Sequence, residues 1–190
     1  MVIVVTTDSL NSIDTLCSML AYTHFLTQQQ EQAICIIPNA LTELQQEVIT
    51  MCKAELPTLQ LEDIKEDNCN FILVNISSLD SIHPRIEPNN ITGIIANFVP
   101  QYFEHIEQDE FGKIHIEEEH SLSTLIVEKF KLTNTPIEHT FASLLLVGII
   151  LNSNGLEERQ TTNRDFVAIE YIEQFANIRK DQINALVNQL

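Results

Sequence analysis

The chain has 190 residues, of which 44% are hydrophobic and 6% aromatic, with 27 acidic residues against 10 Lys and Arg. The resulting net charge of −17 disfavours binding to nucleic acids or anionic membranes, because such proteins need clustered basic residues to meet phosphates. The length and the apolar share suffice for one globular domain with a sizeable core. Only four glycines are present, which leaves little room for a glycine-rich phosphate loop.

The four cysteines lie in or beside apolar stretches and lack the C-x-x-C spacing that zinc and redox sites use. We expect them to be small buried hydrophobic residues in a reducing compartment. The N-terminal residues carry no basic segment, and their apolar run is too short for a signal peptide or a membrane span. These features predict a cytoplasmic protein with no membrane partner.

Short apolar strands alternate with amphipathic helices along the first hundred residues. Strands are expected at Val2–Val5, Ala33–Ile37, Phe71–Ile76 and Ile94–Ala96, and helices at about 12–28 and 41–52. A continuous β-branched run such as Val2–Val5 is typical of a strand buried on both faces of a parallel sheet. The alternation predicts an α/β fold with three αβα layers and a mainly parallel sheet of about five strands.

The second half of the chain is predicted to be helical. It follows an acidic stretch, 104–119, that contains an expected edge strand at 114–116. Helices are expected at about 121–132, 135–151, 162–172 and 183–190, and two of them open with apparent capping boxes, Thr135 with Glu138 and Thr162 with Asp165. We interpret 1–190 as a single domain with a strand–helix part (1–100), a linker or edge strand (101–120) and a helical part (121–190).

Six segments, in order along the chain, resemble motifs of the DHH phosphoesterases. DSLNSIDTLCS (8–18) resembles H-x-N-P-D-x-D-A-x-x-S, ILVN (72–75) resembles an apolar strand ending in Asp, and IIANFVP (94–100) stands where the Asp-His-His-Pro strand lies. HSLSTLIVE (120–128), LVGIILNSNG (146–155) and TTNRD (161–165) are similar to G-A-T-T-T-L-L-V-E, L-x-G-I-x-x-D-T-G and T-T-x-x-D. The wording is nearest to the DHH domain of bacterial tRNA nucleotidyltransferase fusions and to the N-terminal domain of manganese-dependent family II inorganic pyrophosphatases. In both, a second domain follows, and we expect this chain to lack it.

The resemblance implies a two-metal hydrolase, yet the chain departs from the family at most ligand positions. DHH enzymes hold two divalent cations, typically Mn²⁺, with His and Asp side chains. Asp8 and Asp14 are the candidate ligands for Mn²⁺ or Mg²⁺, since only Asp14 keeps the family's residue type and Asp8 is a chemically acceptable replacement for His. The other matching positions are candidates for a ligand pocket, namely Ser12, Asn75, Asn97, Ser123, Thr124 and Asn152. No catalytic residue and no other cofactor is predicted.

Each candidate also has a structural interpretation. Asp before or within the first turn of a helix commonly caps it, and for Asp8 and Asp14 this role is the more frequent one. Asn is favoured at strand ends and turns, which describes the positions of the three candidate asparagines. Ser123 and Thr124 lie at a predicted helix start, where capping is again the commoner role.

Three hypotheses about function follow. The first is a DHH-like domain that has lost its two-metal site and binds a small ligand or a protein without catalysis. The second is a divalent-metal-dependent phosphoesterase acting on pyrophosphate, polyphosphate or nucleotide phosphoesters through a reorganised site at Asp8 and Asp14. The third is an oligomerisation module that forms a homodimer through a C-terminal stripe, consisting of Ile183, Leu186, Val187 and Leu190. A basic protein is a further candidate partner for the acidic stretch 104–119.

Overall fold

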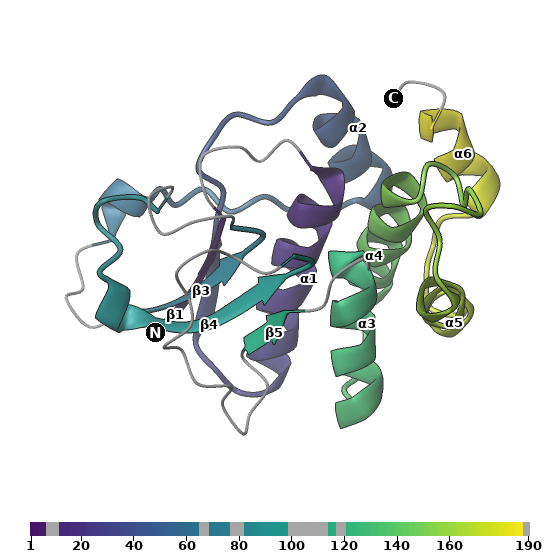
Figure 1. The fold of residues 1–190 in the computed structure, drawn as a ribbon. Helices are drawn as coiled ribbons and strands as arrows, with labels where there is room; N and C mark the ends of the chain where they lie inside the picture. The colour runs from purple at the N-terminus through teal and green to yellow at the C-terminus, as the bar shows by residue number, and fades with distance from the viewer. Residues whose placement is uncertain (7–11, 65–68, 77–81, 99–113, 117–120, 188–190) are drawn as a thin grey trace.

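The computed structural model describes residues 1–6, 12–64, 69–76, 82–98, 114–116 and 121–187. Five parallel strands form one sheet in the order β2-β1-β3-β4-β5 (Figure 1). The strands are β1 (Val2–Val5), β2 (Ala33–Ile36), β3 (Asn70–Val74), β4 (Ile91–Ala96) and β5 (Ile114–Ile116). The predicted α/β class and parallel sheet are thereby confirmed. Apart from β5, the acidic stretch 104–119 lies outside the described residues.

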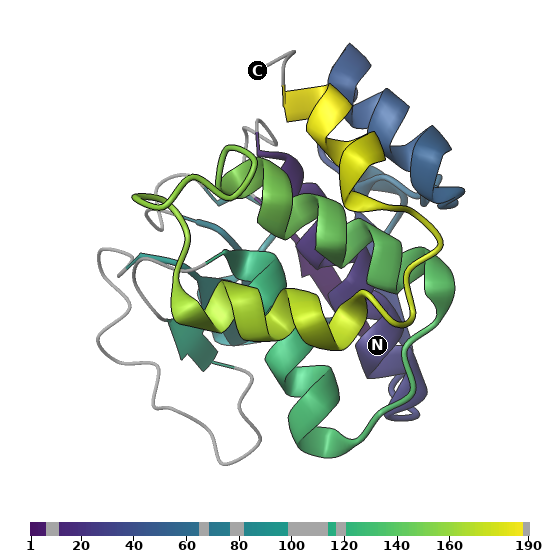
Figure 2. The ribbon, with the colours of Figure 1, turned by 90° about the vertical axis from the view of Figure 1, so that its right-hand side faces the viewer.

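The described residues also form six α-helices. They are α1 (Ile13–Gln28), α2 (Glu43–Cys52), α3 (Leu122–Thr133), α4 (His139–Asn152), α5 (Asn163–Ile172) and α6 (Lys180–Val187). Helix α1 lies between the sheet and the α3–α4 pair, and α5 and α6 pack against α4 (Figures 1 and 2). Among the described helices, none is long and apolar enough to cross a membrane.

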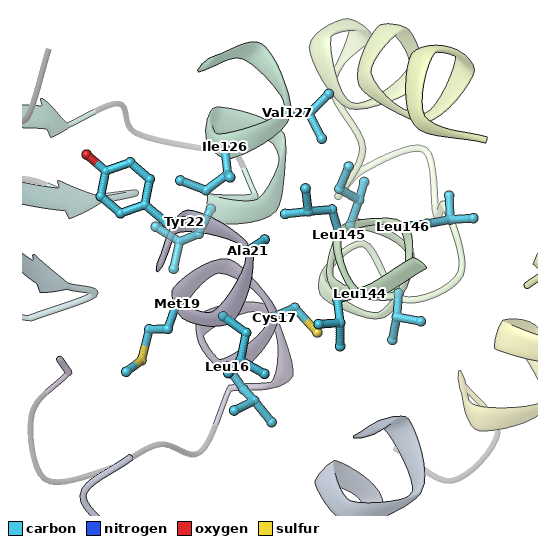
Figure 3. Packing of buried hydrophobic residues seen from close by; sticks show 14 of the residues in the cluster. Leu16, Cys17, Met19, Ala21, Tyr22, Ile126, Val127, Leu144, Leu145 and Leu146 are labelled. Carbon is cyan, nitrogen blue, oxygen red and sulfur yellow. The ribbon is translucent and has the colours of Figure 1, made fainter. Parts of the chain in front are cut away.

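The larger hydrophobic cluster fills the space between the sheet and the α-helices. Because α1 is enclosed on several sides, every residue from Ile13 to Tyr22 is buried. Figure 3 shows Cys17 of α1 pointing toward α4, whereas Met19 points away from α4. The apolar run of α4 completes this cluster, with all of its residues from Ala142 to Leu151 buried. The two helices therefore form the centre of the helical layer.

The opposite face of the sheet carries a smaller hydrophobic cluster. Strand residues such as Ile3 and Leu73 pack there against Leu61 and Ile86. Leu61 belongs to the short 3-10 helix η1 (Leu61–Asp63), and a second one, η3 (Pro88–Asn90), precedes β4. In the described residues this face is thus covered by connections and 3-10 turns, where the sequence had predicted a second layer of α-helices.

One predicted helix start is wrong. Helix α4 begins at His139, and its N-cap residue Glu138 makes no side-chain capping bond, so the box expected at Thr135 does not form. Thr135 is engaged elsewhere, because Gln29 Nε2 donates to its hydroxyl at 2.6 Å. The box expected at Thr162 does form, with both reciprocal bonds to Asp165 present.

The C-terminal stripe is also used within the chain. Ile183 and Leu186 of α6 are 0% and 3% exposed and belong to the larger cluster. Val187 is half-buried against that cluster, and Leu190 lies outside the described residues. Ile183 and Leu186 therefore pack within the chain, where α6 contacts α4, and the homodimer stays a prediction.

All four cysteines are free and buried, as predicted. Burial raises the pKa of Cys35 and of Cys52 to about 12. Burial also raises the pKa of Cys17 well above its usual value, helped by the neighbouring Cys52 and Asp14. The thiols of these three residues remain protonated at neutral pH, which suits inert core residues.

Candidate functional site

The strand order reverses between β1 and β3, which makes their carboxyl ends the topological switch point of the sheet. Ligands of open parallel sheets bind in the crevice outside such a point. Ser12 follows β1 at this edge, Asn75 follows β3, and Asn97 follows β4. Three of the predicted pocket residues therefore share one edge of the sheet.

Ser12 and Asn75 fix the start of α1 against the sheet. The Thr15 N–H donates to Ser12 Oγ at 3.3 Å, which makes Ser12 the N-cap of α1. Asn75 adopts a left-handed backbone with φ of 56°, a conformation that Asn tolerates better than most residues. Its Nδ2 donates to Thr15 Oγ1 at 2.7 Å, and its N–H donates to the Ile95 carbonyl at 2.8 Å. Asn75 thus ties β3 to α1 and β4.

Asp14 caps a helix other than its own. Its side chain is buried and accepts hydrogen bonds from the Leu122 N–H at 2.7 Å and from the Ser123 N–H and Ser121 Oγ at 2.9 Å each. These backbone donors belong to the first turn of α3, where helical N–H groups lack intrahelical partners. Asp14 therefore has the capping role that was predicted, but for α3 rather than for its own helix. The N-cap of α1 is Ser12.

The electrostatics of Asp14 reflect two opposing influences. Burial raises the pKa of its carboxyl above the usual 3.8, while the hydrogen bonds from Ser123, Ser121 and Leu122 act in the opposite direction. The N-terminal dipole of α3 also favours a negative charge at this place. A metal ion could bind this carboxylate only in competition with these donors.

Ser123 and Gly148 bring three helices into close contact. Ser123 Oγ lies 3.2 Å from Ser18 Oγ of α1. A Cβ atom on Gly148 of α4 would lie 2.1 Å from Ser123 Oγ and 3.0 Å from Asp14 Oδ1, so a larger residue would force these neighbours to move. Ser123 does not cap α3, contrary to prediction, since the N-cap position belongs to Ser121. Below, the Asp14 cluster denotes Asp14, Ser18, Ser121, Ser123 and Gly148.

Thr124 faces away from this cluster, toward α5. Its hydroxyl donates to Asp165 Oδ1 at 2.5 Å, while Asp165 Oδ2 accepts from the Thr162 N–H at 2.8 Å. Thr124 is not the N-cap of α3, because that position belongs to Ser121. Arg164 joins the same contact through an ion pair with Glu128 of α3. The segment 161–165 therefore locks α5 onto α3.

The remaining candidates are not drawn into the cluster. Asn97 is half-buried in a bend after β4, and Asn152 is exposed as the last residue of α4. No hydrogen bond in the described part of the chain joins either residue to Asp14. Asp8 lies outside the described residues.

Sequence reasoning missed Thr15 and Ser18, which share the first turns of α1 with Asp14. Asp14 and Ser18 are four residues apart and so lie on one helix face, which is a readable signal. Their partners at 121–123 could be identified only once α1 and α3 were placed side by side.

The described residues do not fit the two-metal centre that the motif resemblance implies. No three His, Cys, Asp or Glu side chains among them gather so that they could hold a metal ion. Asp14 is already bonded to three donors, and Asn75 and Asn97 offer only neutral oxygens. Divalent cations that bridge phosphates depend on carboxylate charge, which this arrangement does not supply.

No protein-family model matches the sequence, and no curated protein matches it. Solved structures match its fold. A candidate family II inorganic pyrophosphatase from Methanococcus jannaschii aligns with a TM-score of 0.73 at 17% identity, over 98% of this chain and 60% of that chain. An exopolyphosphatase-related protein from Bacteroides fragilis aligns with a TM-score of 0.73 at 17% identity, over 100% of this chain and 56% of that chain.

This chain therefore spans less than two thirds of the length of either protein. At such low identity the likeness concerns the arrangement of the backbone alone. The chain has the fold of these pyrophosphatase-like and exopolyphosphatase-related proteins, as its motif resemblance to the DHH phosphoesterases predicted.

Proposed function

We propose that this chain is a non-catalytic domain with a DHH-type phosphoesterase fold, which acts by binding at the switch point of its sheet. The observation that carries this proposal is the Asp14 carboxylate. It is the residue whose type matches the family's metal ligand, and it accepts three hydrogen bonds from the start of α3. A carboxylate committed to a buried helix cap is poorly suited to hold a metal as well.

The chemistry of the neighbouring positions supports the same proposal. Ser12 and Asn75 stand where the resemblance places metal-binding carboxylates, and both contact Thr15 instead. Loss of these negative charges removes the attraction that holds two divalent cations close together. Asn75 Oδ1 is buried and has no hydrogen-bond partner among the described residues, so it offers an acceptor to a ligand with a hydrogen-bond donor.

The experiment that tests the proposal is a titration with MnCl₂ and MgCl₂, followed by calorimetry and by thermal unfolding. Metal that binds only the folded state raises the unfolding temperature by mass action. We expect no stoichiometric heat and no shift with either cation. Hydrolysis of pyrophosphate, tripolyphosphate and a nucleotide phosphodiester, assayed with each cation, should not exceed the buffer rate.

A metal-dependent activity would contradict the proposal. Turnover that needs Mn²⁺ and is lost in both Asp8→Asn and Asp14→Asn would overturn the proposal in favour of a phosphoesterase. Circular dichroism and urea unfolding of each variant distinguish lost chemistry from lost structure. Asp181→Asn serves as the matched control, because Asp181 is an exposed acid on α6 that pairs with Arg179.

A further inference from the structure

The edge strand β2 presents unpaired backbone groups to its surroundings. Val2 is in register with Ala33, and the Val2 N–H donates to the Gln32 carbonyl at 2.8 Å. In a parallel ladder this bond turns the backbone groups of Gln32 and Ile34 toward β1 and those of Ala33 and Cys35 outward. Within the described part of the chain, the outward N–H and C=O groups have no hydrogen-bond partner.

These outward groups lie along an apolar groove of about 470 Å³, which we call the edge groove. Its lining includes Leu20, Phe141 and the segment 55–59. Leu56 and Leu59 in this segment are 39% and 42% exposed. The segment faces β2 without pairing with it, since no backbone hydrogen bond joins the two in the described residues. Pro57, which has no N–H, also limits its ability to act as a sixth strand.

The negative charge at the groove favours a basic binding partner over an acidic one. Glu55 is the acidic residue among the lining residues, and none of those residues is Lys or Arg. Glu138 adds a second carboxylate beside His24, with Glu138 Oε1 3.7 Å from His24 Nε2. A second copy of this chain would bring the same acidic groups and its net charge of −17 against them. A strand that carries basic residues would instead be attracted by these carboxylates.

We propose that the edge groove binds an extended peptide segment of a partner protein, which adds a strand to β2 and carries Lys or Arg beside its apolar residues. The peptide backbone bonds to Ala33 and Cys35, and alternate side chains enter the groove between Phe141 and the segment 55–59. Main-chain bonding supplies affinity in this mode of recognition, and the flanking pockets supply specificity. This site is separate from the switch point of the sheet and does not depend on the function proposed there.

The test uses the full chain and a blocked, fluorescent seven-residue peptide that alternates Val and Thr between terminal lysines. Anisotropy measures binding, and amide hydrogen exchange locates it. We expect saturable binding that slows exchange at Ala33 and Cys35. A peptide N-methylated where it would face β2 should bind about tenfold more weakly, because two hydrogen bonds are lost. A peptide with terminal glutamates in place of lysines should also bind about tenfold more weakly.

Substitutions in the protein test the same binding geometry as the changes to the peptide. Ala33→Pro removes an outward N–H at the first residue of an edge strand, where proline is tolerated, and should weaken binding about fivefold. Glu55→Lys should weaken binding of the lysine peptide and strengthen that of the glutamate peptide. Phe166→Ser is the matched control, because Phe166 is 49% exposed on α5, remote in sequence from the groove, and should leave binding unchanged.

Three results would overturn the proposal. They are no binding of the lysine peptide at millimolar concentration, equal binding of the N-methylated peptide, or binding that leaves exchange at Ala33 and Cys35 unchanged. Sedimentation of the chain alone tests the other occupant, since a dimer that Ala33→Pro abolishes would assign the edge to a second copy. Urea unfolding of each variant shows that a loss of binding does not reflect a loss of the fold.

Discussion

The Asp14 cluster and the edge groove differ in how far their polar groups are hydrogen-bonded. In the Asp14 cluster every carboxylate oxygen is bonded, and the Leu122 and Ser123 N–H groups of the α3 terminus find a partner. Along the edge groove, the backbone groups of Ala33 and Cys35 have no partner among the described residues. The two regions also differ in depth, since Asp14 is 2% exposed whereas Leu56 and Leu59 of the groove are 39% and 42% exposed.

This contrast distinguishes polar groups that stabilise the fold from polar groups that are free to bind a partner. A buried polar group that is fully bonded contributes to the fold and resists new ligands, because binding one would first break existing bonds. A backbone edge without partners gains bonds when a strand arrives. The Asp14 carboxylate belongs to the first kind of polar group, and among the described residues the outward backbone groups of Ala33 and Cys35 belong to the second.

The largest expected effect comes from removing the Asp14 carboxylate. Asp14→Ala leaves a hydroxyl and two backbone N–H groups buried without an acceptor, and should lower the free energy of unfolding by about 3 kcal/mol. Urea denaturation measures this loss. Asp181→Ala removes an exposed acid of α6 and should change stability by less than about 0.5 kcal/mol. Equal effects of the two variants would remove the contrast between a bonded cluster and an ordinary surface acid.

A smaller loss is expected from filling the space at Gly148. In Gly148→Ala the new Cβ would meet Ser123 Oγ at 2.1 Å, so either the Ser123 side chain or α4 must shift, and we expect a loss of about 2 kcal/mol. Combining it with Ser123→Ala removes the clashing oxygen and should recover part of that loss. The double-mutant cycle measures this coupling. Strictly additive effects would show that the helices do not meet at this point.

The smallest effect concerns pH at the rim of the edge groove. Burial lowers the pKa of His24 below the usual 6.5, with the nearby Glu138 acting in the opposite direction. The folded state therefore favours the neutral imidazole, which stacks on Phe141 at 4.0 Å between ring centroids. The stability from this group is present above pH 6.5 and is lost as the pH falls through the lowered pKa.

His24→Phe keeps the stacking and removes the titration. Its free energy of unfolding should fall less than that of the original chain when urea denaturation is repeated from pH 7.5 down to about pH 5. Parallel pH profiles for the two proteins would mean that His24 is not held neutral by the fold.

Most of the fold could be predicted because local patterns and tertiary packing agree. The β-branched run Val2–Val5 became β1, a buried internal strand of the sheet, and the periodic helix at about 12–28 was found as Ile13–Gln28. The start of α4 was mispredicted because a capping pattern in the sequence does not show whether Thr135 has a nearer partner. Here Gln29, far away in the sequence, supplies one.

The candidate site was less predictable. Sequence motifs identified Asp14 and Asn75, and the structure brings both to the start of α1. Their partners came from segments distant in sequence, so the role of each side chain could not follow from spacing. The single-domain organisation and the partners remain predictions, as does any ligand of the crevice.

The sequence by itself determined the alternation of strands and helices and the burial of the cysteines. Each of these depends on residue type and local periodicity. Only the tertiary structure decided that Asp14 caps α3, that Gly148 leaves space for Ser123 and that the outer edge of β2 has no partner strand among the described residues. Those features arise where segments distant along the chain meet, and a buried hydrogen bond exists only when both of its partners are in place.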